Sequence, residues 1–223
     1  MGLKKISKPE PLSKTALRML RHSILTNELK AGVVYNEKGL AGDLGISRTP
    51  VREALLELSA KKLVRFLPQK GVMINTFTDE DIDDVFEIRT ALEIFSIKKI
   101  CGHLKKGDLS RLNGMITAQK KAAVKDDRAG FMTEDNKYHI GFTSLTQNNY
   151  LMEMMQNIRD IMHLMGVRAI DLEGRMQEVV QEHEAIMAAI SREDLAGAID
   201  EMIHHLEQSK AAVKRVYRQV PET

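Results

Sequence analysis

Two helical stretches joined by a tight turn at Gly45 restrict the possible folds of this chain more than any other part of the sequence. A short helix is expected over residues 37–44, because Asn36 before it is a good N-cap residue. Gly45 then supplies the positive φ that a tight turn needs. Pro50 fits the first turn of the following helix, where its missing N–H costs nothing. This second helix is expected to run to about Lys61.

The segments on either side of this helix pair complete a small domain. Apolar positions at helical spacing from Leu12 predict a first helix that ends near Lys30. Downstream, residues 63–67 are apolar and extended, residues 68–71 have turn chemistry, and residues 72–74 return as a strand. The order helix, helix, tight turn, helix and hairpin predicts a winged helix-turn-helix domain.

The net charge of +2 conceals an asymmetry along the chain. Residues 1–75 hold 14 Lys/Arg against 6 Asp/Glu, whereas residues 76–223 hold 19 against 25. A basic module attracts polyanions, of which nucleic acid is the commonest. Charge alone is equally compatible with a solvated surface that is lopsided by chance. The basic residues 1–11 are expected to form a flexible arm.

The hydrophobic pattern changes after Phe77. Thr78 and the acidic residues that follow it are typical of a capped helix start. From there on the pattern is helical, without a convincing strand. We therefore predict a mainly α protein, with a winged helix-turn-helix domain over residues 1–77 and an antiparallel six-helix bundle over residues 78–223. The six helices are expected near residues 79–104, 108–126, 129–146, 149–170, 174–191 and 194–217.

Cysteine content and hydropathy limit the compartment. Cys101 is the single cysteine, so no disulfide framework forms within a chain. No apolar run approaches the roughly 18 residues that a membrane span needs. A cytoplasmic protein without a membrane partner is therefore expected.

The second helix of the turn motif carries the residues that suit DNA. Its apolar positions pack inward, so that its N-terminal end presents Ser47, Arg48, Thr49 and Arg52 outward. The arginine fork matches guanine, while hydroxyls and free N–H groups suit phosphate oxygens. Gly71 at the hairpin tip lets the backbone approach DNA closely, with Lys70 beside it. The alternative is a small helical domain whose exposed arginines are solubilising.

Residues 36–55 closely resemble the signature of the GntR family of bacterial regulators, most specifically in the run Ser-Arg-Thr-Pro-Val-Arg-Glu-Ala-Leu over residues 47–55. In this chain Lys38 and Gly39 depart from the family, which often has arginine and usually glutamate there. Lys38 can neutralise a phosphate but cannot make a bidentate contact. The resemblance implies that DNA is contacted by Arg48, Thr49, Pro50 and Arg52, with Ser47 and Gly71 near phosphates.

Four side chains in the helical half could converge inside the bundle. Asp135 and His139 are separated by four residues and share a face with apolar residues. His183 and His205 lie on inward stripes of two other helices, whereas the adjacent His204 should face water. Buried histidines are often only hydrogen-bonded core residues. Three of them beside an aspartate equally suggest a metal ion, since imidazole and carboxylate suit zinc, nickel, manganese or iron.

The helical half resembles the ligand-binding domain of the FadR-like branch of GntR regulators, the FCD type. The segment Asp-x-x-Tyr-His, the pair Glu182-His183 and the pair His205-Leu206 match metal-site motifs of that domain. The resemblance implies a divalent metal ion, zinc before nickel, manganese or iron, and the length suits the six-helix version. Tyr138 stands where phenylalanine is usual. The implied ligands are Asp135, His139, His183 and His205.

A metal ion held by one carboxylate and three neutral imidazoles keeps a formal charge of +1, and six-coordinate ions would have open positions. A small anionic oxygen ligand is the simplest partner for such a site. Arg89, on the first helix of the bundle, could clamp a second carboxylate of this effector. The alternative for Arg89 is an ion pair with Glu93.

These features together predict a homodimeric DNA-binding transcriptional regulator, most simply a repressor, and not an enzyme. It is expected to bind a palindromic operator in double-stranded DNA, and to release the operator or bind it differently when a small carboxylate reaches the metal. Three alternatives stay open: the metal ion itself is the signal, the histidine site belongs to a metalloenzyme with accessory DNA binding, or the histidines are structural and the bundle only dimerises.

Overall fold

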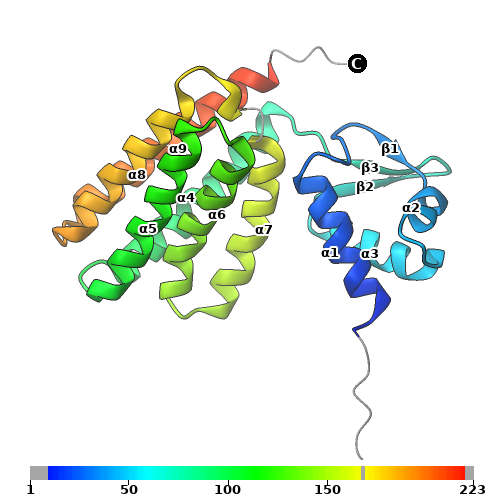
Figure 1. The fold of residues 1–223 in the computed structure, drawn as a ribbon, viewed down its shortest axis with the longest axis horizontal. Coiled ribbons are helices and arrows are strands. Elements are labelled where there is room, and N and C mark those ends of the chain that lie inside the picture. The colour runs from blue at the N-terminus through cyan, green and yellow to red at the C-terminus, as the bar shows by residue number, and fades with distance from the viewer. Residues whose placement is uncertain (1–9, 167–168, 219–223) are drawn as a thin grey trace, which may run out of the picture. The chain divides into compact units, whose positions relative to one another are not determined.

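A computed structural model describes residues 10–166 and 169–218 of the chain, which divides into two compact units between Thr76 and Phe77. The fold is mainly helical with one small sheet, as predicted (Figure 1). Most of the N-terminal arm predicted for residues 1–11 lies outside the described residues. Among those described, none of the helices is long and apolar enough to cross a bilayer.

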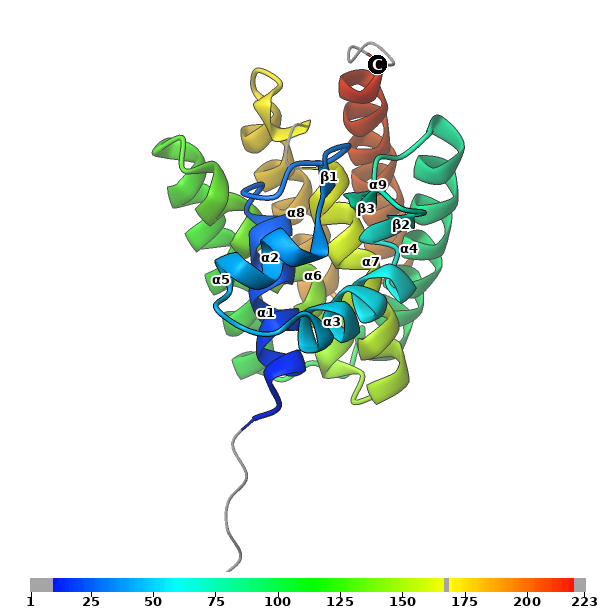
Figure 2. The same ribbon diagram turned by 90° about the vertical axis from the view of Figure 1, so that its right-hand side faces the viewer.

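The first unit has the winged helix-turn-helix arrangement. Helix α1 packs against α3, and the strands form an antiparallel sheet in the order β1-β3-β2, which can be followed in Figure 2. Buried apolar residues of α1, α3 and the sheet form its core. Its elements are α1 (Leu12–Leu25), β1 (Val34–Tyr35), α2 (Glu37–Asp43), α3 (Arg48–Ala60), β2 (Val64–Leu67) and β3 (Gly71–Ile74).

The turn chemistry between α2 and α3 follows the sequence closely. The Asn36 side chain accepts a hydrogen bond from the Lys38 backbone and caps α2, as expected. Gly45 has a φ of 67°, the left-handed conformation that the tight turn requires. Ser47 occupies the N-cap position of α3, but its side chain makes no capping hydrogen bond. The hydroxyl at the start of α3 is therefore free to meet another acceptor or donor.

In the first unit one prediction was wrong and one element was missed. Helix α1 ends at Leu25 rather than near Lys30, because Asn27 takes a left-handed φ of 62° and reverses the chain. The two-residue strand β1 was not predicted, since two residues are too few to show an alternating pattern. This strand explains Gly71: a Cβ there would lie 2.3 Å from the carbonyl oxygen of Tyr35. The glycine is thus required by the sheet itself.

The second unit is a bundle of helices. Thr78 and Asp81 form a capping box at its first turn, as the sequence indicated. The helix predicted over 149–170 ends at Gly166 in the described part of the chain, and Ala169–Asp171 form a short 3-10 turn, η1. The elements are α4 (Asp79–Ile100), α5 (Lys106–Val124), α6 (Arg128–Leu145), α7 (Asn149–Gly166), α8 (Arg175–Ser191) and α9 (Leu195–Tyr217).

The core of the bundle combines a large apolar cluster with an unusual set of buried polar groups. Tyr138, Phe142, Ile186 and Met202 are fully buried. Burial of apolar side chains stabilises such a core by roughly 1.5–3 kcal/mol each. Charged groups inside it need partners. The buried polar side chains on these helices include Arg89, Glu93, Gln119, Asp135, His139, Arg159, Arg175, His183 and His205.

Candidate functional site

Three histidines from three helices meet in the core of the second unit. His139 on α6, His183 on α8 and His205 on α9 each offer one nitrogen, and these nitrogens lie within 4.8 Å of one another. All three side chains are almost completely buried. His204, next to His205 on α9, is exposed, as the helical periodicity indicated. The structure thus brings together three of the four residues predicted as metal ligands.

Each of the three rings is held through its Nδ1 atom by an oxygen acceptor. His139 Nδ1 lies 3.0 Å from Glu93 Oε2, and His205 Nδ1 lies 2.6 Å from Glu182 Oε2. Carboxylates only accept hydrogen bonds when ionised, so Nδ1 carries the proton in both rings. The Nε2 lone pair of His205 therefore remains available to the shared centre, whereas His139 Nε2 accepts a hydrogen bond from Arg89 Nη2, which a bound ion would replace.

Gln119 on α5 fixes the third ring. Its Nε2 donates to Asp135 Oδ1 at 3.3 Å, and its Oε1 lies 2.8 Å from His183 Nδ1. Because an ionised Asp135 can only accept, the Gln119 amide must turn its oxygen toward His183. His183 then donates from Nδ1 and keeps its Nε2 lone pair free. Outer contacts of this kind set the orientation and basicity of metal-bound histidines.

The protonation states suit ligands rather than charged core residues. Burial is the main cause that lowers the pKa of His139, His183 and His205, so the rings are neutral near pH 7. Burial opposes ionisation of Asp135, but the charge of Arg159 and the surrounding groups hold the pKa of its carboxyl well below the usual range. Metal binding requires neutral imidazole and ionised carboxylate, which is the combination present here.

Two of the ring nitrogens have no other use in the described part of the chain. The Nε2 atoms of His183 and His205 are buried and have no hydrogen-bond partner there. An unsatisfied buried polar atom costs roughly 1–3 kcal/mol. Two such atoms pointing at one centre fit a cation that accepts their lone pairs. The residues present therefore fit a divalent metal ion.

Asp135 borders the same space. Its Oδ1 lies 3.9 Å from His139 Nε2 and 3.8 Å from His183 Nε2, while Oδ2 is held by Arg159. Ligand atoms on one ion with bonds of about 2.1 Å are roughly 3–4 Å apart, so Oδ1 is near a ligand position. Arg159 also donates from Nε to Asn136 at 3.1 Å and so locks this carboxylate in place.

Arg89 makes the ion pair that the sequence offered as an alternative. Its Nε lies 3.0 Å from Glu93 Oε1, and its Nη2 lies 2.9 Å from His139 Nε2. The pairing with Glu93 does not remove Arg89 from the site, since the guanidinium also lines the neighbouring pocket. A role in effector binding remains a prediction.

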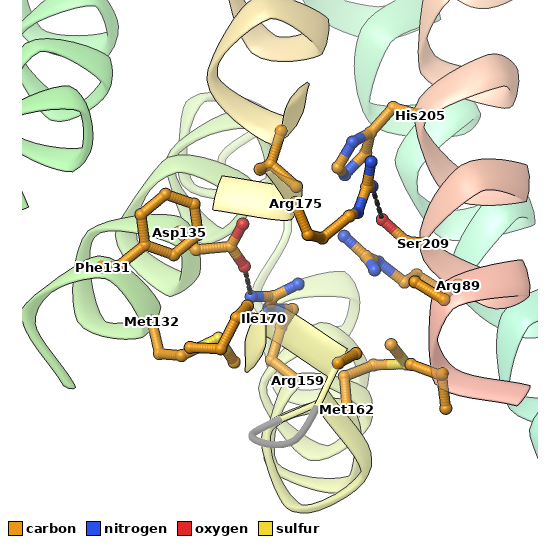
Figure 3. Close-up of a pocket in the computed structure, with 14 residues that line it drawn as sticks. Arg89, Phe131, Met132, Asp135, Arg159, Met162, Ile170, Arg175, His205 and Ser209 are labelled. Atoms are coloured by element: carbon orange, nitrogen blue, oxygen red, sulfur yellow. Dashed lines mark hydrogen bonds and ion pairs between the residues drawn. The ribbon is translucent and has the colours of Figure 1, made fainter. Parts of the chain in front are cut away.

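A pocket opens beside the histidines, with a cavity volume of about 50 Å³. Figure 3 shows Arg89, Arg159 and Arg175 pointing into it together with Asp135 and His205. Arg175 donates to both carboxylate oxygens of Glu182 and to Ser209 Oγ. The rest of the wall is mostly apolar: Phe131, Met132, Met162, Ala169, Ile170, Val179, Ala212 and Val213. The pocket thus combines cationic donors with short apolar surfaces.

The residues predicted to meet DNA lie at the surface of the first unit. Pro50 and Gly71 are half-buried, and Lys70 is the last residue of the β2–β3 turn, where its N–H donates to the Leu67 carbonyl at 3.1 Å. Such a placement leaves the charged groups hydrated and accessible to a polyanion. The exposed residues of the predicted set are Lys38, Ser47, Arg48, Thr49, Arg52 and Lys70.

Glu37 organises the two arginines at the start of α3. Arg52 Nη1 lies 2.8 Å from Glu37 Oε1, and Arg48 Nη2 lies 3.7 Å from Glu37 Oε2. The Arg52 guanidinium also lies over the Phe66 ring, 5.7 Å from its centroid. Sequence reasoning did not single out Glu37 or Phe66, because a buried glutamate at a helix start looks like an ordinary acidic first-turn residue.

Sequence reasoning also missed most of the groups that orient the metal site. Glu93 entered only as a partner of Arg89, and Glu182 only within a motif. Gln119, Arg159 and Arg175 gave no signal other than charged or polar side chains on a helix. An inward helical position could have marked them, since such residues are almost never buried without a partner.

Both units match family profiles of known proteins. The sequence profile of the family described as bacterial regulatory proteins, gntR family, matches residues 12–74, and the FCD domain profile matches residues 84–208. The gluconate operon transcriptional repressor of Bacillus licheniformis is 25% identical over 78% of this chain and 74% of its own length.

Solved structures share the fold. McbR/YncC of E. coli superposes with a TM-score of 0.82 at 22% identity, over 94% of this chain and 100% of its own. The structure described as the metal-free FCD domain of TM0439 has a TM-score of 0.52 at 23% identity, over 65% of this chain and 99% of its own. At these identities the similarity establishes the architecture of the two units.

Proposed function

The chain belongs to the gntR family of bacterial regulatory proteins and carries an FCD domain, and from this premise we propose a transcriptional repressor whose hold on operator DNA is controlled by a small carboxylate at a metal centre. The family and the relatives of this chain are transcriptional regulators rather than enzymes. The first unit is the DNA-binding domain in this proposal, and the second binds metal and effector.

One observation carries the metal part of the proposal. The Nε2 atoms of His183 and His205 are buried without a partner among the described residues, and they lie beside His139 and Asp135. Buried polar atoms without a partner are few in native proteins, and two that face one centre are explained by an ion between them. We assign His139, His183 and His205 as ligands, with Asp135 as the fourth.

The ion would act as a Lewis acid that attracts an anionic oxygen. The side chains of Glu93, Gln119 and Glu182 hold the three histidine rings through Nδ1, so that the Nε2 atoms face the ion site. Arg89 lies beside the same centre and would receive the effector carboxylate. Zinc accepts three imidazoles and one carboxylate and would have to expand to five ligands to take up the effector, whereas six-coordinate nickel, manganese or iron would keep open positions with the same ligand set.

Most of the proposed DNA contacts come from the start of α3. Arg48 and Arg52 would read base edges in the major groove, and Thr49 and Pro50 would lie against the DNA beside them. Ser47 and Lys38 would meet phosphates, as would Lys70 and Gly71 of the hairpin.

A two-fold dimer through the second unit is part of this function. One short recognition helix reads only a few base pairs, so two copies are needed for a palindrome. Sedimentation of the full chain at micromolar concentration should give a dimer. A monomer both with and without operator DNA would contradict the palindromic arrangement.

An effector can change operator affinity only if it binds the DNA-competent and DNA-incompetent states differently. The ligands come from α6, α8 and α9, so completing the metal shell can shift these helices relative to one another. A coupling of about 1–3 kcal/mol, or roughly 5- to 150-fold in operator affinity, is expected. By reciprocity, operator DNA should change effector affinity by the same factor.

The decisive experiment measures binding of fluorescent operator DNA to the full-length protein while small carboxylates are added. It is run on metal-loaded protein and on chelator-treated protein whose folding is confirmed by circular dichroism. We expect an active acid to weaken operator binding only in the metal-loaded form. An acid that works equally well on folded, metal-free protein would show that the metal is structural. A change of operator affinity on adding metal alone, with no further effect of any acid, would make the metal itself the signal.

A further inference from the structure

Without a metal ion, the buried charged side chains around the histidines form ion pairs that carry no net charge. Three guanidinium groups are each bonded to a buried or largely buried carboxylate: Arg89 to Glu93, Arg159 to Asp135, and Arg175 to Glu182, with the exposed Glu178 as a further partner of Arg175. Five of these six paired side chains are buried, and that of Glu182 is 9% exposed. A divalent cation added to this set leaves two positive charges in a largely enclosed site. Uncompensated buried charge is strongly unfavourable.

Two of the guanidinium groups still have donors to offer. The hydrogen bonds of Arg89 use Nε and Nη2, and those of Arg159 also use Nε and Nη2. Within residues 10–166 and 169–218, neither Nη1 atom has a hydrogen-bond partner. Both arginines line the same pocket, and both point into it in Figure 3.

Arg89 and Arg159 also repel each other. Both guanidinium groups are buried and line one pocket, where like charges are poorly screened. An anion between the two groups would relieve this repulsion and satisfy both Nη1 atoms. Arg–carboxylate hydrogen bonds are short and about twice as strong as neutral ones.

We propose that the pocket binds a short dicarboxylate, with one carboxylate at the metal centre and the second between Arg89 and Arg159. This inference rests on the proposed function and narrows its effector to one chemical class. Two negative charges neutralise the divalent cation, whereas a monocarboxylate leaves one buried positive charge uncompensated.

The shape of the pocket limits the chain between the two carboxylates. The cavity of about 50 Å³ is larger than the 10–15 Å³ that one water needs. It therefore admits only a short ligand, which favours the shortest chain between the two carboxylates. Met132, Met162 and Ile170 supply an apolar wall that suits methylene carbons.

The test compares acids of equal length on metal-loaded, full-length protein by isothermal titration calorimetry. Succinate is compared with butyrate, and glutarate with valerate. We expect the better dicarboxylate to bind roughly 10- to 100-fold more tightly than its monocarboxylate, because charged hydrogen bonds are worth about 1.5–3 kcal/mol. Inorganic phosphate, with similar charge but no separated groups, should bind less tightly than that dicarboxylate.

A variant locates the second carboxylate. Arg159→Gln should reduce the preference for the dicarboxylate to about threefold or less, and the ratio of the two affinities is the readout, because it isolates the second carboxylate from any change at the metal. Met162→Leu changes the same pocket wall at nearly constant volume and should keep the preference. Metal content is measured on each variant. If Arg159→Gln does not fold or hold metal, the wild-type comparison of acids decides alone.

The outcomes separate this inference from the proposed function. Equal affinity for matched mono- and dicarboxylates, or phosphate binding as tightly as succinate and glutarate, would overturn the dicarboxylate assignment and leave a metal-dependent carboxylate regulator intact. Absence of binding by all these acids at millimolar concentration would overturn the carboxylate effector itself.

Discussion

The two units use arginine in opposite ways. In the first unit the side chains of Arg48 and Arg52 are 66% and 58% exposed, and their nearest carboxylate is the shared Glu37. In the second unit the side chains of Arg89 and Arg159 are each 3% exposed, and each has a carboxylate of its own. Exposed arginines stay hydrated and can meet a large polyanion, whereas buried ones can serve only a ligand that enters the core.

This difference determines where a substitution can alter function without lowering the stability of the fold. A surface arginine can be removed with little effect on folding, because surface substitutions usually change stability by less than about 0.5 kcal/mol. Removing one partner of a buried ion pair leaves an uncompensated charge, which costs roughly 3–5 kcal/mol. Function and stability are therefore separable in the DNA-binding unit and linked in the bundle.

The largest effect is expected at the metal ligands. His183→Ala should lower metal affinity at least about 100-fold, since even outer-shell changes cost 10–100-fold. His204→Ala is the matched control, because His204 is exposed on α9 beside His205. Metal content by mass spectrometry, after purification without chelator or nickel resin, gives the readout. Equal metal loss in both variants would contradict the assignment of His205 over His204.

A smaller effect is expected at the surface arginines. Arg48→Ala should weaken binding to the specific operator by roughly 1–3 kcal/mol and relax specificity at one position. Arg52→Ala should act in the same direction, and both variants should keep the wild-type melting temperature within a few degrees. Fluorescence anisotropy on specific and scrambled DNA measures the effect. Wild-type operator affinity in both variants would show that α3 is not the reading helix.

The contact between Glu182 and His205 tests the buried network without removing a ligand. Glu182→Gln keeps an oxygen acceptor for His205 Nδ1, as Gln119 already does for His183. We expect metal affinity to fall about tenfold, at the low end of the outer-shell range. Competition with a chromogenic chelator measures it. A loss as large as that of His183→Ala would mean that Glu182 itself binds the metal.

The smallest effect is expected at the hairpin. Lys70→Ala should weaken specific and scrambled DNA alike and reduce the salt dependence of log K by about one unit of slope. The measurement is operator affinity at several salt concentrations. A loss confined to the specific operator would assign Lys70 to base recognition rather than to phosphate.

The sequence located the residues of both sites through local patterns. The run from Ser47 to Leu55 is contiguous, so its helix start and exposed face follow from neighbouring residues. His139, His183 and His205 were recognised as inward residues because a helix repeats every 3.6 residues. The same periodicity separated His205 from His204, since adjacent residues point about 100° apart. The errors at the end of α1 and at β1 came from single backbone conformations that leave no periodic trace.

Only the tertiary structure decided what surrounds those histidines. The contact from Glu93 to His139 spans 46 residues of sequence, and that from Gln119 to His183 spans 64. Helical periodicity orients a side chain toward the core but does not say which residue of another helix it meets there. The pairs Arg89–Glu93 and Arg175–Glu182 each lie within one helix, but the pairing of Arg159 with Asp135 and the approach of Arg89 and Arg159 to one pocket depend on the packing of separate helices. The sequence thus marks the candidate metal ligands locally, whereas the charged groups gathered around them are a property of the folded bundle.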